Sequence, residues 1–174
     1  MTSKIERGHR DPVATTKLRL FADYFQLHVM DENAEDDLSD AWTDEAVADA
    51  LAVAERTLGI GTEVNMYVEV TVELLDRTPG DADDESDHVV EASIEVPSGR
   101  ITILGCTDYL PDAARFDVPK GFVRVRASRA NLANVRQPGE EGHDAPEAVE
   151  QVHLQIWPAP HSSPVVIKRW TPSG

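Results

Sequence analysis

The sequence has few of the features that mark a secreted or membrane-bound protein. It contains one cysteine, Cys106, so no internal disulfide can form. No apolar run approaches the roughly 20 residues that a membrane-spanning helix requires. The first twenty residues, MTSKIERGHRDPVATTKLRL, lack the apolar stretch of a signal peptide. We therefore expect a cytoplasmic protein that does not insert into a membrane.

Positive charge is scarce and unevenly placed. The 174 residues include 32 acidic and 16 basic side chains. Residues 21–98 contain 22 of the acids and only two bases, Arg56 and Arg77, which gives this stretch a net charge of −20 and leaves +4 on the remainder. Because proteins bind phosphate through lysine and arginine, we expect no direct nucleic-acid binding. Such a charge favours a basic protein as the partner.

Solubility and salt adaptation would also account for the acidity, and both stay open. Acidic side chains often serve only to keep a surface solvated and soluble. Adaptation to high salt would fit the ratio of 12 arginines to four lysines. Salt adaptation should distribute the acids along the whole chain, however, and the last 76 residues are not strongly acidic.

Alternation of apolar and polar residues predicts a mainly β protein. The clearest strand runs over 63–75, and a second over 90–96 has the same pattern, so we expect these two to form an antiparallel hairpin across a polar loop. Other segments with strand patterns lie at 17–30, 101–104, 116–118, 122–127, 152–156 and 164–170.

One helix is expected to begin after Thr43, whose hydroxyl can accept a hydrogen bond from a free backbone N–H. Apolar residues recur at helical spacing as far as Leu58, and Gly59 or Gly61 would end the helix. The combined pattern predicts an antiparallel β-sandwich of six to eight strands, with one short helix packed at an end or edge. We expect a weakly ordered N-terminal segment over 1–14 and a single domain over 15–170.

Motifs for catalysis, cofactor binding and metal binding are not found. There is no nucleophile elbow, phosphate loop or dinucleotide fingerprint. The six histidines lack metal-ligand spacing, and the acidic stretch 81–92 has Ser86 and Ala92 where a calcium loop needs glycine and glutamate. We expect no enzyme activity, cofactor or metal, although a site assembled from distant residues stays open.

Two local features have simple structural interpretations. Cys106 lies among apolar residues without an identifiable base, which favours a buried or half-buried thiol over a nucleophile. Arginines gather at 124, 126, 129 and 136. We interpret them as one face of a sheet that forms ion pairs with acidic residues, and not as an anion site.

Three passages resemble the competence protein J family in order and spacing. They are Phe25-Gln26-Leu27-His28-Val29, Ala41-Trp42-Thr43-Asp44-Glu45-Ala46, and Phe116-Asp117-Val118-Pro119-Lys120-Gly121. The similarity covers about Phe25 to Trp157, and this chain has longer insertions at 31–40, 77–88 and 129–148. Members of that family inhibit a DNA-entry nuclease, so the resemblance implies a non-enzymatic inhibitor of a basic protein such as a nuclease. An accessory β-sandwich protein whose acidity serves solubility or salt tolerance is the alternative.

An inhibitor of a nuclease can place carboxylates where the enzyme receives phosphates. On this hypothesis two acidic loops face the partner, and Trp42 is either an apolar anchor for it or a plug between helix and sheet. The expected partner-binding residues are Asp31, Glu32, Glu35, Asp36, Asp37, Asp40, Trp42, Asp81, Asp83, Asp84, Glu85 and Asp87.

Overall fold

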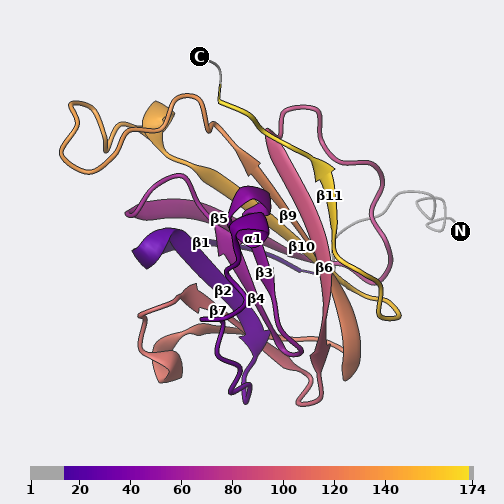
Figure 1. Cartoon of the computed structure of the whole chain (residues 1–174). Coiled ribbons are helices and arrows are strands. Elements are labelled where there is room, and N and C mark those ends of the chain that lie inside the picture. Colours follow the sequence, from indigo (N-terminus) through magenta and orange to yellow (C-terminus); the bar gives the residue numbers. More distant parts are fainter. Residues whose placement is uncertain (1–13, 173–174) are drawn as a thin grey trace, which may run out of the picture.

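The computed structural model describes residues 14–172. Within them the chain forms 11 strands in two sheets, where six to eight strands were expected, and one α-helix. The two sheets pack face to face as a β-sandwich (Figure 1). The expected weakly ordered segment falls mostly on residues 1–13, which lie outside the described residues.

The first sheet has six strands and the second has five. Neighbouring strands of the first are, in order, β1 (Ala14–Phe21), β5 (Tyr67–Leu74), β10 (Gln151–Pro158), β9 (Gly121–Ala130), β6 (His88–Val96) and β11 (Val165–Lys168). Those of the second are β3 (Leu51–Val53), β4 (Thr57–Gly61), β2 (Gln26–Asp31), β7 (Arg100–Gly105) and β8 (Ala114–Asp117). Strand β10 runs parallel to β5, so the first sheet is mixed and not purely antiparallel.

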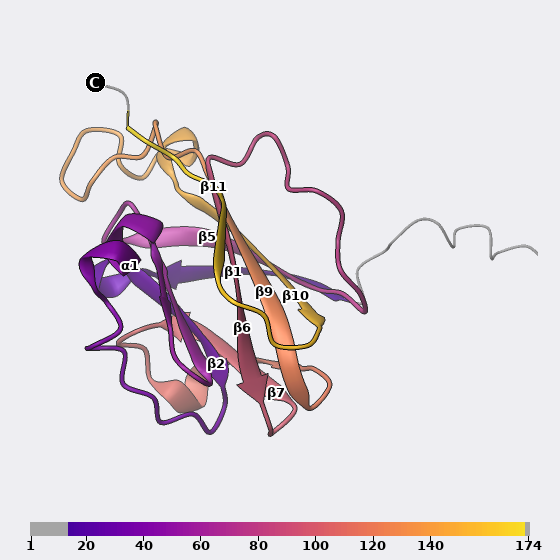
Figure 2. The ribbon, with the colours of Figure 1, turned by 45° about the vertical axis from the view of Figure 1, so that its right-hand side comes forward.

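The remaining elements are short. Helix α1 (Asp44–Asp49) lies near one end of the sandwich, close to β3 (Figure 2). Single 3₁₀ turns are η2 (Asp23–Phe25), η3 (Leu110–Asp112) and η4 (Pro146–Ala148).

The core follows from the alternation seen in the sequence. Every second residue of each central strand points between the sheets, because successive side chains of a strand point to opposite faces. In β5 these residues are Val68, Val70 and Val72, and in β9 they are Val123, Val125 and Ala127, all of them buried. The second sheet supplies Leu27, Val29, Leu58, Ile60, Ile101 and Ile103 to the same cluster.

The expected helix is much shorter than its apolar pattern. Thr43 is the N-cap as expected, since its Oγ1 accepts from the Ala46 N–H at 3.1 Å, but α1 ends at Asp49. Ala50 then adopts a left-handed conformation, and residues 51–61 form β3 and β4. Leu51, Leu58 and Ile60 of this segment are buried in the core as parts of two strands, so tertiary packing overrides the local helical periodicity.

The expected hairpin between 63–75 and 90–96 is wrong. The strands β5 and β6 belong to the same sheet, but β10 and β9 lie between them. Three strand spacings amount to about 14 Å. The polar segment of residues 75–87 is long enough to cross that distance. Alternation identified the buried faces but contained no information about which strands pair.

Two residues of the expected arginine cluster, Arg124 and Arg126, form ion pairs on one face of the first sheet, whereas Arg129 lies on the opposite face and Arg136 lies beyond β9. On the outer face of the sheet, Glu91 accepts from Arg124 Nε at 3.1 Å and from Arg126 Nε at 2.8 Å. Arg126 also donates to the Gly80 carbonyl, and Arg124 donates to the carbonyls of Ser162 and Ser163. These bonds hold two long connections against the sheet and bury both arginines.

Gly105 offers a direct test of how closely the two sheets approach. A Cβ at this position would lie 2.1 Å from the Phe21 carbonyl oxygen, a backbone atom that cannot move aside cheaply. We expect Gly105→Ala to lower the free energy of unfolding by about 1–3 kcal/mol, measured by urea denaturation. Gly80→Ala is the control, because a Cβ there meets nothing within 4 Å. Equal stability of the two variants would contradict the packing described here.

Candidate functional site: an aromatic groove beside the helix

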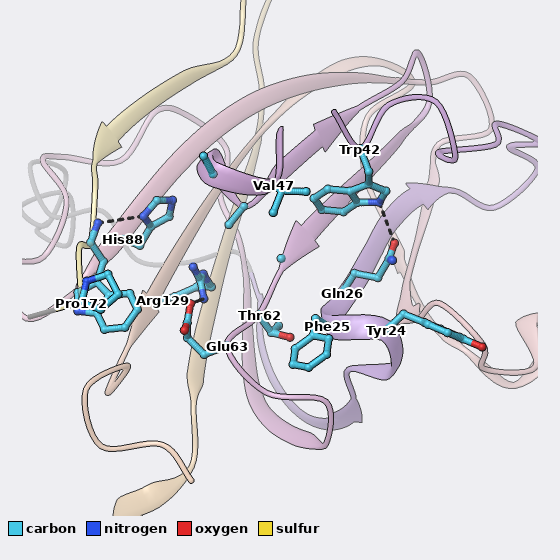
Figure 3. A pocket seen from close by; sticks show the side chains of 14 residues that line it. Tyr24, Phe25, Gln26, Trp42, Val47, Thr62, Glu63, His88, Arg129 and Pro172 are labelled. Atoms are coloured by element: carbon cyan, nitrogen blue, oxygen red, sulfur yellow. Dashed lines mark hydrogen bonds and ion pairs between the residues drawn. The ribbon is translucent and has the colours of Figure 1, made fainter. Parts of the chain in front are cut away.

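A groove opens at the α1 end of the sandwich. Its volume is about 700 Å³. The 3₁₀ turn η2, helix α1, residues 61–63, the ends of β6 and β9, and the C-terminal segment at Trp170 and Pro172 all line it. Figure 3 shows Phe25 and Trp42 on one side of this aromatic groove, with His88, Arg129 and Glu63 on the other.

The polar residues at the floor of the groove occupy strand positions that point to the same side as the core residues. His88 and Arg129 are paired residues on β6 and β9, and they share the face of the buried valines of those strands. Glu150 directly precedes β10 on the equivalent face. The core is therefore apolar along most of its length and ends in three buried polar side chains, His88, Arg129 and Glu150, with exposures of 3%, 3% and 0%.

A buried ion pair closes the floor. Arg129 Nη1 donates to Glu150 Oε2 at 2.9 Å and lies 3.8 Å from Glu63 Oε1. The second oxygen of Glu150 accepts from the Glu63 backbone N–H at 2.8 Å. Burial raises the pKa of Glu150, and Arg129 opposes that shift. The charge of Arg129 is used internally, while the Glu63 side chain keeps a third of its surface exposed.

The rim of the groove is apolar and exposed. Tyr24 is 69% exposed, Val47 63% and Phe25 47%. Side chains of this kind cost free energy in water, and their concentration at one site is typical of an interaction surface. In Figure 3, Val47 projects from α1 between Trp42 and the floor residues.

The backbone around the groove is strained. Tyr24, Phe25 and Ala50 have φ angles of 57°, 60° and 58°, in the left-handed region that non-glycine residues avoid. Between residues 14 and 172 only one other non-glycine residue, Asn131, has positive φ, and asparagine tolerates it. Three such residues at one groove cost about 1–3 kcal/mol each, and conformations of this kind concentrate at binding sites.

His88 ties the C-terminal segment to the helix. Its Nδ1 accepts the Trp170 backbone N–H at 3.1 Å (Figure 3). The proton of the neutral ring is therefore on Nε2, which donates to the Asp49 carbonyl at 2.7 Å. Arg169 adds bonds to the Ala48 carbonyl and the Asp49 carboxylate. Both ring nitrogens are occupied, so the neutral ring fixes one wall of the groove.

Trp42 serves two structural purposes. Its Nε1–H donates to Gln26 Oε1 at 3.1 Å, and its ring covers Gly59 on the outer face of β4, where a Cβ would lie 2.6 Å from Cζ2. The half-buried ring also forms part of the groove wall. It therefore packs against the sheet, as the plug interpretation states, and keeps one surface toward the groove.

The acids of 31–40 divide into internal and exposed groups. Asp31 was expected to face a partner, but it is only 2% exposed. Its carboxylate accepts from the Ser98 N–H and hydroxyl at 3.0 and 2.7 Å, so it is bonded within the fold. Asp36 accepts from the Arg56 backbone N–H and the Thr57 hydroxyl, and Glu32 pairs with Arg115. The exposed carboxylates without such long-range bonds are those of Glu35, Asp37 and Asp40.

The acids of 81–87 lie on another part of the molecule. Asp81, Asp83, Asp84 and Glu85 are exposed, whereas Asp87 accepts from the Leu132 N–H at 3.0 Å. This segment lies against the outer face of the first sheet, and the acids of 31–40 contact the second. The β5–β6 connection lies across the molecule from the β2–α1 connection (Figures 1 and 2). The two loops do not form one surface.

Several groove residues were not among the expected site residues. The sequence signal for Arg129 and His88 was present, because both continue the core-facing alternation of their strands. The positions of Phe25, Val47 and Trp170 depend on the left-handed turns and the C-terminal segment, which leave no local pattern. Cys106 is half-buried as expected, and burial raises the pKa of its thiol.

The described part of the chain contains neither a cluster of metal-binding side chains nor a membrane-spanning helix. Among residues 14–172, no group of three or more histidine, cysteine, aspartate or glutamate side chains is arranged to hold a metal ion. None of the helices in the same range is long and apolar enough to cross a membrane.

Comparison with known proteins places this fold in a class of two-sheet sandwiches that includes a nuclease inhibitor. No protein-family model and no curated protein matches the chain. Two solved structures do. One is ComJ of Bacillus subtilis, an inhibitor of the DNA-degrading activity of NucA, with a TM-score of 0.62 at 16% identity over 86% of this chain and 98% of ComJ. The other, described as crocagin biosynthetic gene J, has a TM-score of 0.55 at 18% identity over 84% and 98% of the two chains. The resemblance noted in the sequence therefore extends to the fold.

The bonds of His88 make stability depend on pH. Burial lowers the pKa of His88 below its ordinary value of 6.5, and Arg129 and Arg169 act in the same direction. As the pH falls below 6.5, His88 is protonated in the unfolded chain before it is protonated in the folded chain. The contribution of His88 to stability is therefore fully present above pH 6.5 and is lost as the pH falls. The loss is at most about 1.4 kcal/mol per histidine for each pH unit.

We therefore expect the wild type to lose more free energy of unfolding between pH 7.5 and pH 5.5 than His88→Gln, because Glu150, whose raised pKa acts in the opposite direction, is present in both. Burial also lowers the pKa of His28, which is likewise present in both. His161→Gln, at an exposed histidine, is the control and should behave as the wild type. Urea denaturation at both pH values measures the effect. An undiminished loss in His88→Gln would contradict the neutral ring.

Proposed function

We propose that this protein is a non-enzymatic inhibitor that binds a basic protein, a nuclease of the DNA-entry type. The observation that carries the proposal is the combination of a fold similar to that of ComJ with an excess of 20 acidic charges in residues 21–98. Neither feature alone is sufficient, because one fold supports many functions and acidity also serves solubility.

The proposed mechanism is occupation of a polyanion-binding site. A nuclease concentrates positive charge where DNA phosphates bind, and carboxylates of an inhibitor can occupy the same positions. The acids best placed for this are the exposed Glu35, Asp37 and Asp40, together with Asp44 and Glu45 at the start of α1. The exposed acids of 81–87 lie elsewhere and would contribute to long-range attraction more than to contact.

The proposal includes the expected cytoplasmic location and the absence of direct nucleic-acid binding. The basic side chains support the second point, because most of the buried arginines are paired internally. Arg124 and Arg126 bind Glu91, and Arg129 binds Glu150. Acids also outnumber bases by 32 to 16 in the whole chain, which opposes the binding of phosphates.

The experiment is affinity capture from source cells followed by an activity assay. The chain is immobilised and exposed to lysate at about 0.01 M and about 1 M salt, where screening lengths are about 30 and 3 Å. We expect a basic protein to be retained at low salt and released at high salt, and its DNA cleavage to stop when the free chain is added. If nothing is retained at either salt, the accessory sandwich with solubilising charge is the correct account.

The captured partner then allows a test of the acidic surface. The triple variant Glu35→Gln, Asp37→Asn, Asp40→Asn removes three exposed charges and leaves the internally bonded Asp31 and Asp36 in place. We expect its association rate to fall by about tenfold at low salt, with a flatter dependence on salt, because steering by charge mainly affects association.

The matched control removes three exposed acids of the β9–β10 connection, outside this loop: Glu141→Gln, Asp144→Asn, Glu147→Gln. It lowers the net charge equally but should change the association rate much less. Surface plasmon resonance at several salt concentrations measures both. Equal rates for the two triple variants would show that position is irrelevant and would contradict a local acidic contact.

A further inference from the structure

We infer that the aromatic groove receives a bulky apolar side chain of the partner, with a lysine or arginine next to it that pairs with Glu63 and the acids of α1. The inference rests on the proposed function and specifies which surface makes the central contact. An acidic surface provides attraction and orientation, but the binding energy of protein interfaces comes mainly from a few buried apolar and aromatic anchors.

The groove has the size and rigidity of a binding site. A volume of about 700 Å³ lies within the range of about 300–1,000 Å³ that is typical of ligand pockets. Its floor is fixed by the Arg129–Glu150 pair and one wall by the two bonds of His88. A site that is already ordered loses little conformational entropy on binding.

The surface of the groove is apolar where it is most exposed. Of the eight large hydrophobic residues that are strongly exposed in the described chain, Tyr24, Phe25 and Val47 lie on this rim. Trp42 and Trp170 add aromatic surface inside it. Covering these side chains with an aromatic or long aliphatic group would remove apolar area from water at about 25 cal/mol per Å².

The charges at the groove indicate which type of residue should lie next to the apolar side chain of the partner. The cations that reach it are occupied: Arg129 is paired with Glu150, and Arg169, beside Trp170, with Asp49. The His88 ring is neutral, with both nitrogens bonded. The Glu63 carboxylate is partly exposed, and Asp44 and Glu45 are exposed on α1. An anionic ligand finds no free cation among the described residues here, whereas a basic residue beside the anchor finds carboxylates.

The charge balance also argues against a second copy of this chain as the occupant. Two chains of net charge −16 repel each other at low salt, and the acids around the groove would meet more acids. A basic partner removes that repulsion. The same surface therefore combines apolar attraction with selection for positive charge.

The first test needs no knowledge of the partner. Random twelve-residue peptides displayed on phage are selected for binding to the wild-type chain. The retention of the enriched peptides is then measured on Val47→Asp, which places a carboxylate on the apolar rim. We expect enriched peptides to share a bulky apolar residue adjacent to lysine or arginine, and to be lost on Val47→Asp. Absence of enrichment, a consensus without this pair, or equal retention by the variant would overturn the inference.

The second test uses a synthetic peptide with the enriched sequence. Its binding is followed by tryptophan fluorescence, since Trp42 and Trp170 line the groove and Trp157 is buried at 2% exposure. We expect Tyr24→Ser to weaken affinity at least about tenfold and Glu63→Gln to weaken it less. Tyr109→Ser is the matched control, because Tyr109 is 70% exposed and lies outside the groove. Equal affinities for Tyr24→Ser and Tyr109→Ser would overturn the inference.

The two proposals fail in different ways. A chain that blocks the captured nuclease but selects no apolar and basic peptide leaves the inhibitor function intact and overturns the groove. A chain that selects such peptides and inhibits no nuclease supports the groove and overturns the inhibitor function.

Other occupants of the groove would be recognised by separate measurements. Self-association that is lost in Val47→Asp, measured by sedimentation, would assign the groove to a second copy of the chain. A small molecule found in the groove by native mass spectrometry would assign it to that ligand. Either result overturns the inference.

Discussion

The α1 end of this sandwich depends on the buried contact between Arg129 and Glu150. The pair joins the end of β9 to the start of β10, and Glu150 also binds the backbone of Glu63. Removing one member of a buried pair leaves an unpaired charge and costs about 3–5 kcal/mol, much more than a surface ion pair contributes. The apolar core therefore ends at this buried pair, next to the groove.

The sequence predicted the parts of the structure that follow from local pattern. Alternation of apolar residues located most strands and their buried faces, and Thr43 marked the start of the helix. Pairing was not predictable, because β10 pairs with β5 through residues that are 82 positions apart in sequence. The helix was overestimated because small apolar residues suit a helix stripe and a buried strand equally well, and the core decides between them.

The candidate site could be predicted from the sequence only in part. Charge counts located the acidic loops but could not distinguish a carboxylate that faces solvent, as in Asp37, from one that bonds the fold internally, as in Asp31. That distinction depends on Ser98, which is 67 residues away in sequence. The groove itself needs left-handed turns at Tyr24 and Phe25 and a C-terminal segment held by His88. These are long-range arrangements with no local signature.

Acidity and the aromatic groove together give an account in which charge attracts a basic partner and apolar anchors hold it. The most direct measurement is amide hydrogen exchange of this chain, alone and with the captured partner bound. If the partner binds at the groove, exchange should become slower at residues 24–25 and 42–50, the turn and helix that border the groove, and should change little in β11. Protection confined to residues 81–87 and the outer face of the first sheet would contradict this account.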